Sequence, residues 1–186
     1  MRPVGRFRGF RIAGRRSKAF SVGEDFPMST PAIPPGYHSL QSYFTVRDTA
    51  RAITFYRDLF GAEEIVRMLM PDGKTVMHAE VKIGDSVLML SEENLDWGTK
   101  SPLALGGTAV SMMHYVPDVD AVYARAMTLG CVSMMPPADM FWGDRFSKFT
   151  DPFGHQWGVA THIKNPSPEE MEAGRKAMFE GGCSDV

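Results

Sequence analysis

The chain has 186 residues, 44% of them hydrophobic, which suits one globular domain or two small modules packed together. Residues 1 to 27 hold seven of the 20 Lys and Arg residues and two of the 22 Asp and Glu residues, so the remainder carries 13 basic against 20 acidic side chains, a net charge of −7. An acidic domain is a poor candidate for binding phosphate backbones, and no stretch approaches the roughly 20 apolar residues of a membrane span. We therefore expect neither a nucleic acid nor a membrane as partner.

A long extension precedes the first predicted element. Residues 1–36 are rich in Pro, Gly and Arg and show no sustained periodicity, which predicts a disordered basic segment. This segment fits a solvated arm without function, an organellar targeting segment, or an extension ahead of a start at Met28. It has no apolar stretch of signal-peptide length, and Cys131 and Cys183 lack the spacing of a zinc or disulfide motif. We therefore expect a cytoplasmic protein with reduced thiols.

The first ordered half, from about residue 38 to residue 92, is predicted to be a strand, a helix and three further strands. SLQSYFTV (39–46) is rich in aromatic and β-branched residues, as expected for a strand. Asp48 follows at an N-cap position, apolar residues then recur at helical spacing, and Gly61 ends the helix. The three strands after it are predicted at residues 63–70, 75–83 and 86–92.

The same order of elements recurs from about residue 108 to residue 163. A predicted strand leads to a helix that Asp118 caps and Gly130 ends, with the same signals as in the first half. A short strand at 131–134 follows, and Pro136-Pro137 is expected to open a loop after it.

The turn Asp-Pro-Phe-Gly (151–154) separates the last two predicted strands, because proline presets one backbone angle and glycine takes a conformation that other residues resist. The repeat as a whole predicts an α+β domain, residues 37–163, built from two βαβββ modules at about 38–92 and 108–163. A C-terminal helix and tail are expected in residues 164–186.

Paired βαβββ modules with these landmarks resemble the vicinal oxygen chelate superfamily, which includes glyoxalase I, bleomycin-resistance proteins, fosfomycin-resistance enzymes and extradiol dioxygenases. Within it, the chain is most similar to the PhnB-like branch. The resemblance covers residues 38 to 163 and implies that each module curls into a half-barrel, that the two modules face each other around a cavity, and that the protein is a homodimer. It is carried by YFTVRDTARAITFYRDLFGAEE (43–64), MPDGKTVMHAEVKIGDSVLMLSEE (70–93), YVPDVDAVYARAMTLG (115–130) and MFWGDRFSKFTDPFGHQWGVATH (140–162).

The resemblance also implies four ligand positions for a divalent metal ion, on the first and last strands of each module. In this sequence they fall on Gln41, Met89, Ser111 and Gly158. A glutamine amide oxygen can bind a metal ion, whereas a thioether, a hydroxyl and a glycine are poor replacements for carboxylate or imidazole. We therefore expect no metal ion and no other cofactor, and we expect Gly158 to leave room in the cavity.

An alternative metal site remains open. His78 and Glu80 lie on one face of a predicted strand and are the best remaining pair of metal-like residues. With Gln41 they could hold a divalent ion in a lyase, isomerase or dioxygenase, although catalytic residues stay unknown. Of the other histidines, His155 is expected to be exposed in its turn, and His162 is expected near the rim of the cavity.

The residues that replace the metal ligands predict an organic-ligand pocket, mainly apolar with a few neutral polar groups. Trp142 could stack on a ligand, and Arg145, oriented by Asp144, could grip a carboxylate or phosphate. The competing interpretation of this loop is an exposed hairpin with an ordinary salt bridge. The expected ligand-binding residues are Gln41, Tyr43, His78, Met89, Ser111, Met113, Trp142, Arg145 and Gly158.

Together these features predict a protein that binds a small, partly aromatic or anionic organic molecule in a metal-free cavity between the modules, similar to bleomycin-resistance proteins. The metal-dependent enzyme described above is the alternative. A third hypothesis is a structural protein that works through its dimer surface.

Overall fold

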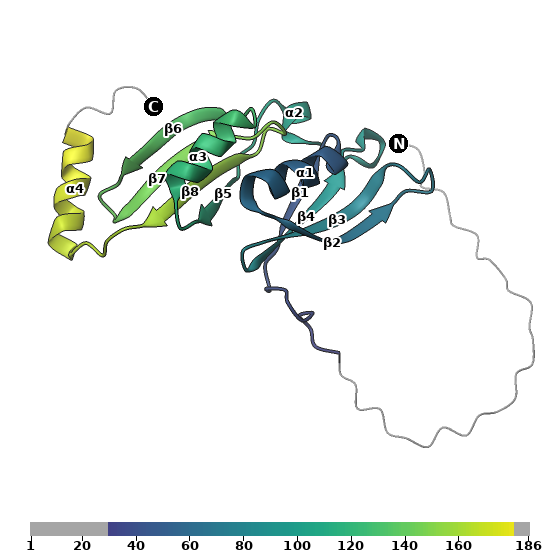
Figure 1. The fold of residues 1–186 in the computed structure, drawn as a ribbon, viewed down its shortest axis with the longest axis horizontal. Helices are drawn as coiled ribbons and strands as arrows, with labels where there is room; N and C mark the ends of the chain where they lie inside the picture. Colours follow the sequence, from purple (N-terminus) through teal and green to yellow (C-terminus); the bar gives the residue numbers. More distant parts are fainter. Residues whose placement is uncertain (1–29, 181–186) are drawn as a thin grey trace, which may run out of the picture. The chain divides into compact units, whose positions relative to one another are not determined.

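The computed structural model describes residues 30–180, so most of the predicted basic extension lies outside the described residues. From Ile33 onward the described chain forms one compact unit. Its strands form two four-stranded sheets with the orders β1-β4-β3-β2 and β5-β8-β7-β6 (Figure 1). In each sheet the first strand pairs in parallel with the last, and the other pairs are antiparallel. The predicted α+β fold of two βαβββ modules is therefore confirmed.

The elements of the first module are β1 (Ser42–Val46), α1 (Thr49–Phe60), β2 (Glu63–Leu69), β3 (Val76–Ile83) and β4 (Ser86–Glu92). Those of the second module are β5 (Ser111–Tyr115), α3 (Val119–Thr128), β6 (Val132–Asp139), β7 (Asp144–Thr150) and β8 (Gln156–His162). The segment between the modules holds a 3₁₀ turn, η1 (Leu95–Trp97), and the short helix α2 (Pro102–Leu105), and the chain continues after β8 into α4 (Pro168–Glu180). No helix within residues 30–180 has the length and apolar character required to cross a membrane.

The start of α1 is tied to the end of β4. The Asp48 side chain accepts a hydrogen bond from the Arg51 N–H, as an N-cap should. Asp48 itself has a φ of 64°, which is unfavourable for a residue other than glycine. Glu92 offsets this strain, because its carboxylate accepts hydrogen bonds from the N–H groups of Asp48 and Thr49, at 2.7 and 2.8 Å.

Strand β6 is longer than the sequence predicts. It continues through Pro136-Pro137 to Asp139, where a loop was expected. The strand lies at the edge of its sheet, and its pairing with β7 shifts register between Ser133 and Met135 and again between Met135 and Ala138. An edge strand with bulges tolerates proline because the missing N–H need not join the ladder.

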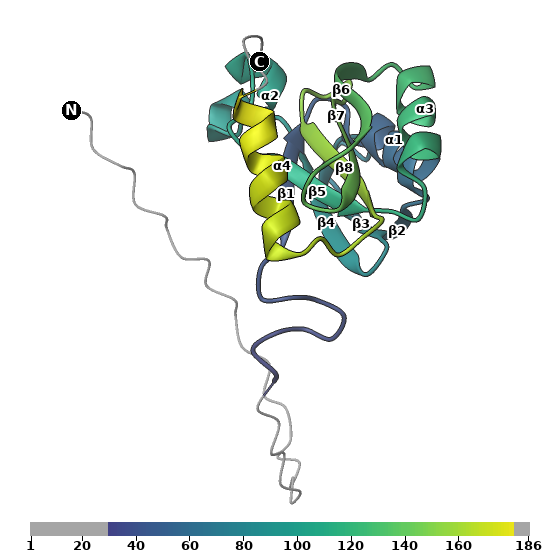
Figure 2. The same ribbon diagram turned by 90° about the vertical axis from the view of Figure 1, so that its left-hand side faces the viewer.

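The core runs continuously from one module to the other. Helices α1 and α3 lie on the same side of the two sheets in both views (Figures 1 and 2), and the Arg125 guanidinium of α3 donates to the Leu59 carbonyl of α1 at 2.9 Å. The buried hydrophobic side chains of both sheets pack with those of these helices in one cluster, on the helix side of the sheets. We call the opposite side of each sheet its open face.

Asp151, the first residue of the Asp-Pro-Phe-Gly turn, holds the modules together from within the core. Its Oδ2 atom accepts hydrogen bonds from the Tyr56 hydroxyl at 2.7 Å and from the Trp157 indole N–H at 3.0 Å. Its Oδ1 atom accepts from the N–H groups of Phe153 and His155, both at 2.9 Å. Burial, together with the Asp151 charge, raises the pKa of Tyr56 well above its usual value.

His155 is buried, contrary to the expectation that it is exposed. It is 8% exposed, its ring stacks on Phe44 with centroids 3.7 Å apart, and its Nε2 atom lies 3.3 Å from the Thr45 carbonyl oxygen. The turn therefore packs against β1 instead of facing solvent. Burial lowers the pKa of His155, with opposition from the Asp151 charge.

Candidate functional site

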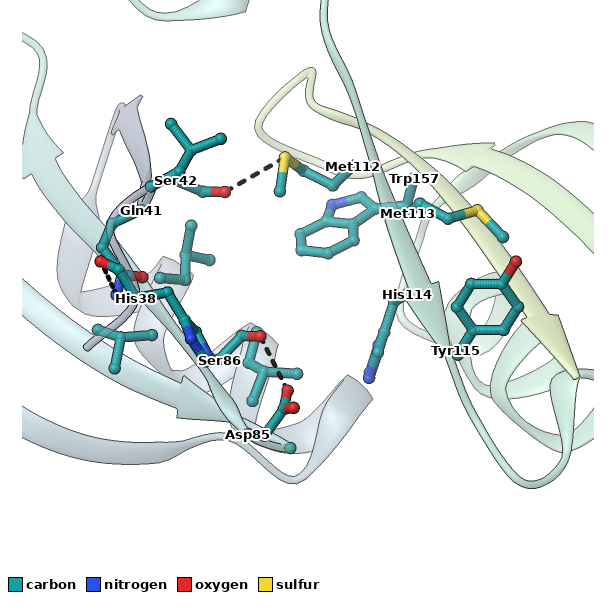
Figure 3. Close-up of a pocket in the computed structure, with 15 residues that line it drawn as sticks. His38, Gln41, Ser42, Asp85, Ser86, Met112, Met113, His114, Tyr115 and Trp157 are labelled. Carbon is teal, nitrogen blue, oxygen red and sulfur yellow. Dashed lines mark hydrogen bonds between the residues drawn. The ribbon is translucent and has the colours of Figure 1, made fainter. Parts of the chain in front are cut away.

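A pocket of about 450 Å³ lies between the two modules, and we call it the junction pocket. Figure 3 shows His38, Gln41 and Ser86 on one side of it and His114 and Tyr115 on the other. The Ser42 hydroxyl of β1 and the Met112 sulfur of β5 meet across the junction at 3.6 Å. The pocket is thus built where the edge strands of the two sheets come together.

The walls of the junction pocket combine apolar and polar groups. Trp157 and Met112 contribute aromatic and thioether surface, and Leu88 adds an aliphatic side chain. Asp85 stands at the turn between β3 and β4, where the Ser86 hydroxyl donates to its carboxylate at 2.9 Å. The composition of the walls is typical of a site for a small organic molecule.

His114 is the polar group of this pocket with the most perturbed environment. Burial lowers its pKa, and the nearby charge of Asp85 only partly opposes this, so the imidazole is neutral at neutral pH. Its ring meets Phe60 edge to face, with centroids 4.9 Å apart. Among residues 30–180 its buried Nδ1 atom has no hydrogen-bond partner.

A second cavity, of about 640 Å³, lies between β1 and the segment at residues 100–112, and we call it the linker pocket. Tyr43 and Phe44 of β1 line one side of it, and Pro102 and Leu105 of α2 line the other. Lys100 is the charged residue among its walls.

Tyr43, His78 and Met89, three of the predicted site residues, lie on the open face of the first module. Phe44 and Val46 of β1 are buried toward the helices, so strand alternation turns Tyr43 to the open face, directly opposite Met89. The Tyr43 hydroxyl and the His78 Nδ1 atom are 2.9 Å apart.

Glu80 completes a hydrogen-bonded chain on this face. Its Oε1 atom lies 3.0 Å from His78 Nε2, and its Oε2 atom accepts a hydrogen bond from the Tyr37 hydroxyl. Sequence reasoning gave no role to Tyr37, because nothing in the residues before β1 indicates that they reach across to β3. Burial works to raise the pKa of Glu80, but the hydrogen bonds from Tyr37 and His78 outweigh it and hold that pKa below its usual value.

Met113, Gly158 and Trp142 gather on the open face of the second module. Met113 is the register partner of Gly158, whereas Ser111 pairs with Gln156 further along the strand. A Cβ atom placed on Gly158 would lie 2.9 Å from the Phe146 ring and 3.1 Å from the Met113 sulfur. The missing side chain therefore does not leave the expected room, because Phe146 and Met113 fill it.

Asp144 is the polar centre of this second open face and is 4% exposed. Its carboxylate lies 3.1 Å from the Tyr115 hydroxyl and from the Trp142 indole N–H, both of which donate to it, and 2.8 Å from His162 Nδ1. These bonds raise the pKa of Tyr115 and that of His162. Trp142 is therefore anchored by Asp144 and packs edge-on against Phe146, with centroids 6.0 Å apart.

Arg145 points to the other side of the sheet. Its guanidinium bonds Asp120 of α3 at 2.7 Å and Asp139 of β6 at 2.9 Å. The expectation that Asp144 orients Arg145 is therefore wrong, because neighbouring residues of a strand face opposite sides. Its two carboxylate partners match the competing interpretation of an ordinary salt bridge.

The positions that would hold the superfamily's metal ion do not suit one in this chain. Met89 and Gly158 face Tyr43 and Met113 in register, so each pair lacks a carboxylate or imidazole donor. Two members of the alternative set, His78 and Glu80, are already hydrogen-bonded. Both His78 nitrogens and both Glu80 oxygens have partners, whereas Gln41 donates from its amide nitrogen to the His38 carbonyl at 3.3 Å, which does not engage its metal-binding oxygen. Within the described residues, no group of three or more His, Cys, Asp or Glu side chains is arranged to hold a metal ion.

This chain is similar to other proteins in sequence and, for solved structures, in fold. An uncharacterized protein of Mycobacterium tuberculosis is 36% identical over 146 residues, covering 77% of this chain and 85% of the relative. The PhnB protein from Bacillus cereus is 18% identical, with a TM-score of 0.53 over 67% of this chain and 99% of that one. The fosfomycin resistance protein FosX from Listeria monocytogenes, solved with Mn(II) and sulfate, is 18% identical, with a TM-score of 0.51 over 72% of this chain and 94% of that one.

The sequence of residues 38–159 matches the family model described as Glyoxalase/Bleomycin resistance protein/Dioxygenase superfamily, which is the superfamily that the sequence resembles. This match spans most of both modules, and the sheet order and βαβββ repeat agree with it. The chain belongs to the Glyoxalase/Bleomycin resistance protein/Dioxygenase superfamily.

Proposed function

We propose that this protein binds a small organic molecule with a flat apolar body in the junction pocket, without using the superfamily's metal chemistry. The observation that carries the proposal is the chemistry of the pocket walls. Trp157 and Met112 offer apolar surface, and Gln41, Ser42 and Ser86 add neutral polar groups. Of the predicted ligand-binding residues, Gln41 and Met113 line this pocket.

The charges of the walls narrow the class of ligand. Asp85 is the carboxylate of the junction pocket, and Lys and Arg are absent from its described lining. His114 is neutral because burial lowers its pKa, so it adds no positive charge. These groups favour a neutral or amine-bearing aromatic molecule over an anion, which narrows the prediction made from the sequence.

A matched set of ligands tests this preference by calorimetry. Naphthylmethylamine, naphthylmethanol and naphthoate share one flat body and differ in charge. We expect the amine to bind more tightly than the carboxylate by roughly thirtyfold, because one nearby carboxylate attracts the amine and repels the ligand carboxylate by about 1 kcal/mol each at a partly exposed site. Asp85→Asn should remove this preference, whereas Asp96→Asn, an exposed carboxylate outside the pocket, should leave it unchanged.

A blocking variant tests the place of binding. Ser86 is exposed and lines the pocket, so Ser86→Trp should fill the pocket and abolish binding while leaving the core intact. Tight binding of naphthoate, equal binding to Ser86→Trp and the unchanged chain, or no binding of any of the three compounds at millimolar concentration would each overturn the proposal.

We also propose that the protein is a homodimer that works in the cytoplasm. Members of the superfamily often dimerise, and size-exclusion chromatography with light scattering would give twice the chain mass of 20.6 kDa for a dimer. Burial raises the pKa of Cys131 to about 12, so its thiol is unreactive and suits a reducing compartment. A single-chain mass at micromolar concentration would contradict the dimer.

A further inference from the structure

We propose that Tyr43 is an acyl-accepting nucleophile, activated by His78 and Glu80, on the open face of the first module. This reactivity goes beyond ligand binding in the junction pocket and does not depend on it. The Tyr43 hydroxyl, the His78 imidazole and the Glu80 carboxylate form a continuous chain, with contacts of 2.9 Å and 3.0 Å. A nucleophile bonded to a base that is itself oriented by a third group is the arrangement used in covalent catalysis.

The hydrogen bonds decide where the protons lie. Hydrogen bonds hold the pKa of Glu80 below its usual value against the effect of burial, so its carboxylate is ionised and accepts from its neighbours. His78 therefore donates from Nε2 to Glu80, and in that tautomer its Nδ1 atom is an acceptor. The Tyr43 hydroxyl donates to Nδ1, and its oxygen keeps lone pairs for a substrate.

Tyr115 shows why the interposed imidazole matters. The two tyrosines are similarly exposed, Tyr43 at 53% and Tyr115 at 59%. Tyr115 donates directly to the Asp144 carboxylate, which raises the pKa of Tyr115 and keeps its proton in place. Tyr43 donates to an imidazole, a much better proton acceptor than a carboxylate, and the imidazolium that forms lies against Glu80.

The chemical step is acyl transfer from an ester. The Tyr43 oxygen forms a bond to the acyl carbon as the Tyr43 proton passes to His78 Nδ1. The bond from the acyl carbon to the leaving oxygen then breaks, and that oxygen takes the proton from His78, which gives an acyl-tyrosine and an alcohol or phenol. No electrons are gained or lost, and no cofactor is required.

The surroundings of Tyr43 suit an ester with an apolar body. Tyr43 is among the residues that line the linker pocket, where Pro102 and Leu105 offer apolar surface, whereas His78 and Glu80 lie outside the lining of that pocket. The side chains opposite these hydrogen-bonded residues on the neighbouring strands are uncharged. Met68 lies opposite His78, and both Val66 and Met89 lie opposite Glu80. Besides His78, the ionisable groups in this series of hydrogen bonds are Tyr37, Glu80 and Tyr43.

The test uses the full-length protein and p-nitrophenyl acetate, with peptide mass mapping to locate the acetyl group. We expect Tyr43 to be acetylated roughly tenfold faster than Tyr115, since general base assistance commonly contributes a factor of ten or more. Tyr43→Phe should remove the early release of p-nitrophenolate. Glu80→Gln and His78→Phe should slow acetylation of Tyr43 by roughly tenfold and leave that of Tyr115 unchanged, which also shows that each variant is folded.

A conservative variant separates activation from a structural role. His78→Gln keeps a polar side chain that can hydrogen-bond to Tyr43 and Glu80 but cannot act as a base, so it should slow the Tyr43 rate as much as His78→Phe does. If His78→Phe does not fold, Glu80→Gln tests whether His78 and Glu80 activate Tyr43. Ser86→Trp blocks the junction pocket and should leave the Tyr43 rate unchanged, so a failure of the ligand-binding proposal is distinguishable from a failure of this one. Equal acetylation of Tyr43 and Tyr115, or a Tyr43 rate that Glu80→Gln and His78→Phe do not alter, would overturn the proposal.

Discussion

The open faces of the two modules carry the same three kinds of group in a different order. In the first module a tyrosine meets a histidine, and the histidine meets the buried Glu80. In the second module both Tyr115 and His162 meet the buried Asp144 directly, together with the Trp142 indole. Each open face thus carries a buried carboxylate, which supports the proposed nucleophile in the first module and holds a fixed network in the second.

Removing the centre of the second network should have the largest effect on stability. Asp144→Ala leaves the Tyr115, Trp142 and His162 side chains without their shared acceptor, so we expect the free energy of unfolding to fall by about 3 kcal/mol. Urea unfolding followed by tryptophan fluorescence measures this change. Asp96→Ala, an exposed carboxylate in η1, is the control and should alter it by less than about 0.5 kcal/mol. A loss no greater than that of the control would remove the structural role we assign to Asp144.

Placing a glutamate at the superfamily's metal position in the second module should lower the free energy of unfolding somewhat less than Asp144→Ala does. Gly158→Glu brings a Cβ atom against the Phe146 ring and the Met113 sulfur, so we expect a loss of about 2 kcal/mol from overpacking. Adding Phe146→Ala should recover part of this loss, as a double-mutant cycle in urea would show. If Gly158→Glu is as stable as the unchanged chain, Phe146 and Met113 do not fill that position.

The smallest expected effect is the contribution of His162 to the pH dependence of stability. Its pKa is raised, first by the Asp144 side chain and then by Asn165, so the protonated ring is favoured in the folded state. The stabilisation is fully present below the unfolded pKa of about 6.5 and is lost as the pH rises through the higher folded value. Unfolding measured across this pH range for the unchanged chain and for His162→Gln should show the two curves converging as the pH rises. A difference that grows with pH would contradict the assignment.

Local signals predicted the order of strands and helices in each module, because caps and periodicity act within a few residues, but they did not predict η1 or α2. Asp48, Gly61 and Asp118 all serve as the predicted caps. The predictions were wrong where the structure depends on contacts between strands that are distant in sequence. The pairing of β6 with β7 carries the strand through Pro136-Pro137, and β1 buries His155.

The residues of the candidate site illustrate the same limit. Strand alternation correctly places His78 and Glu80 on one face, because that depends on two neighbouring positions of one strand. It cannot show that Tyr37 reaches Glu80 or that Arg145 bonds Asp120, since those contacts depend on how separate elements pack. Of the nine predicted ligand-binding residues, Gln41 and Met113 line the junction pocket, Gln41 and Tyr43 line the linker pocket, and Arg145 faces α3.

Elemental analysis of protein purified without chelator tests most directly whether either open face holds the superfamily's metal ion. Because the metal positions lack donors and the donors of His78 and Glu80 are committed to each other, we predict far less than one divalent ion per chain. His78→Ala should leave that content unchanged. One ion per chain that is lost in His78→Ala would contradict the claim and restore the metal-dependent enzyme as the better interpretation.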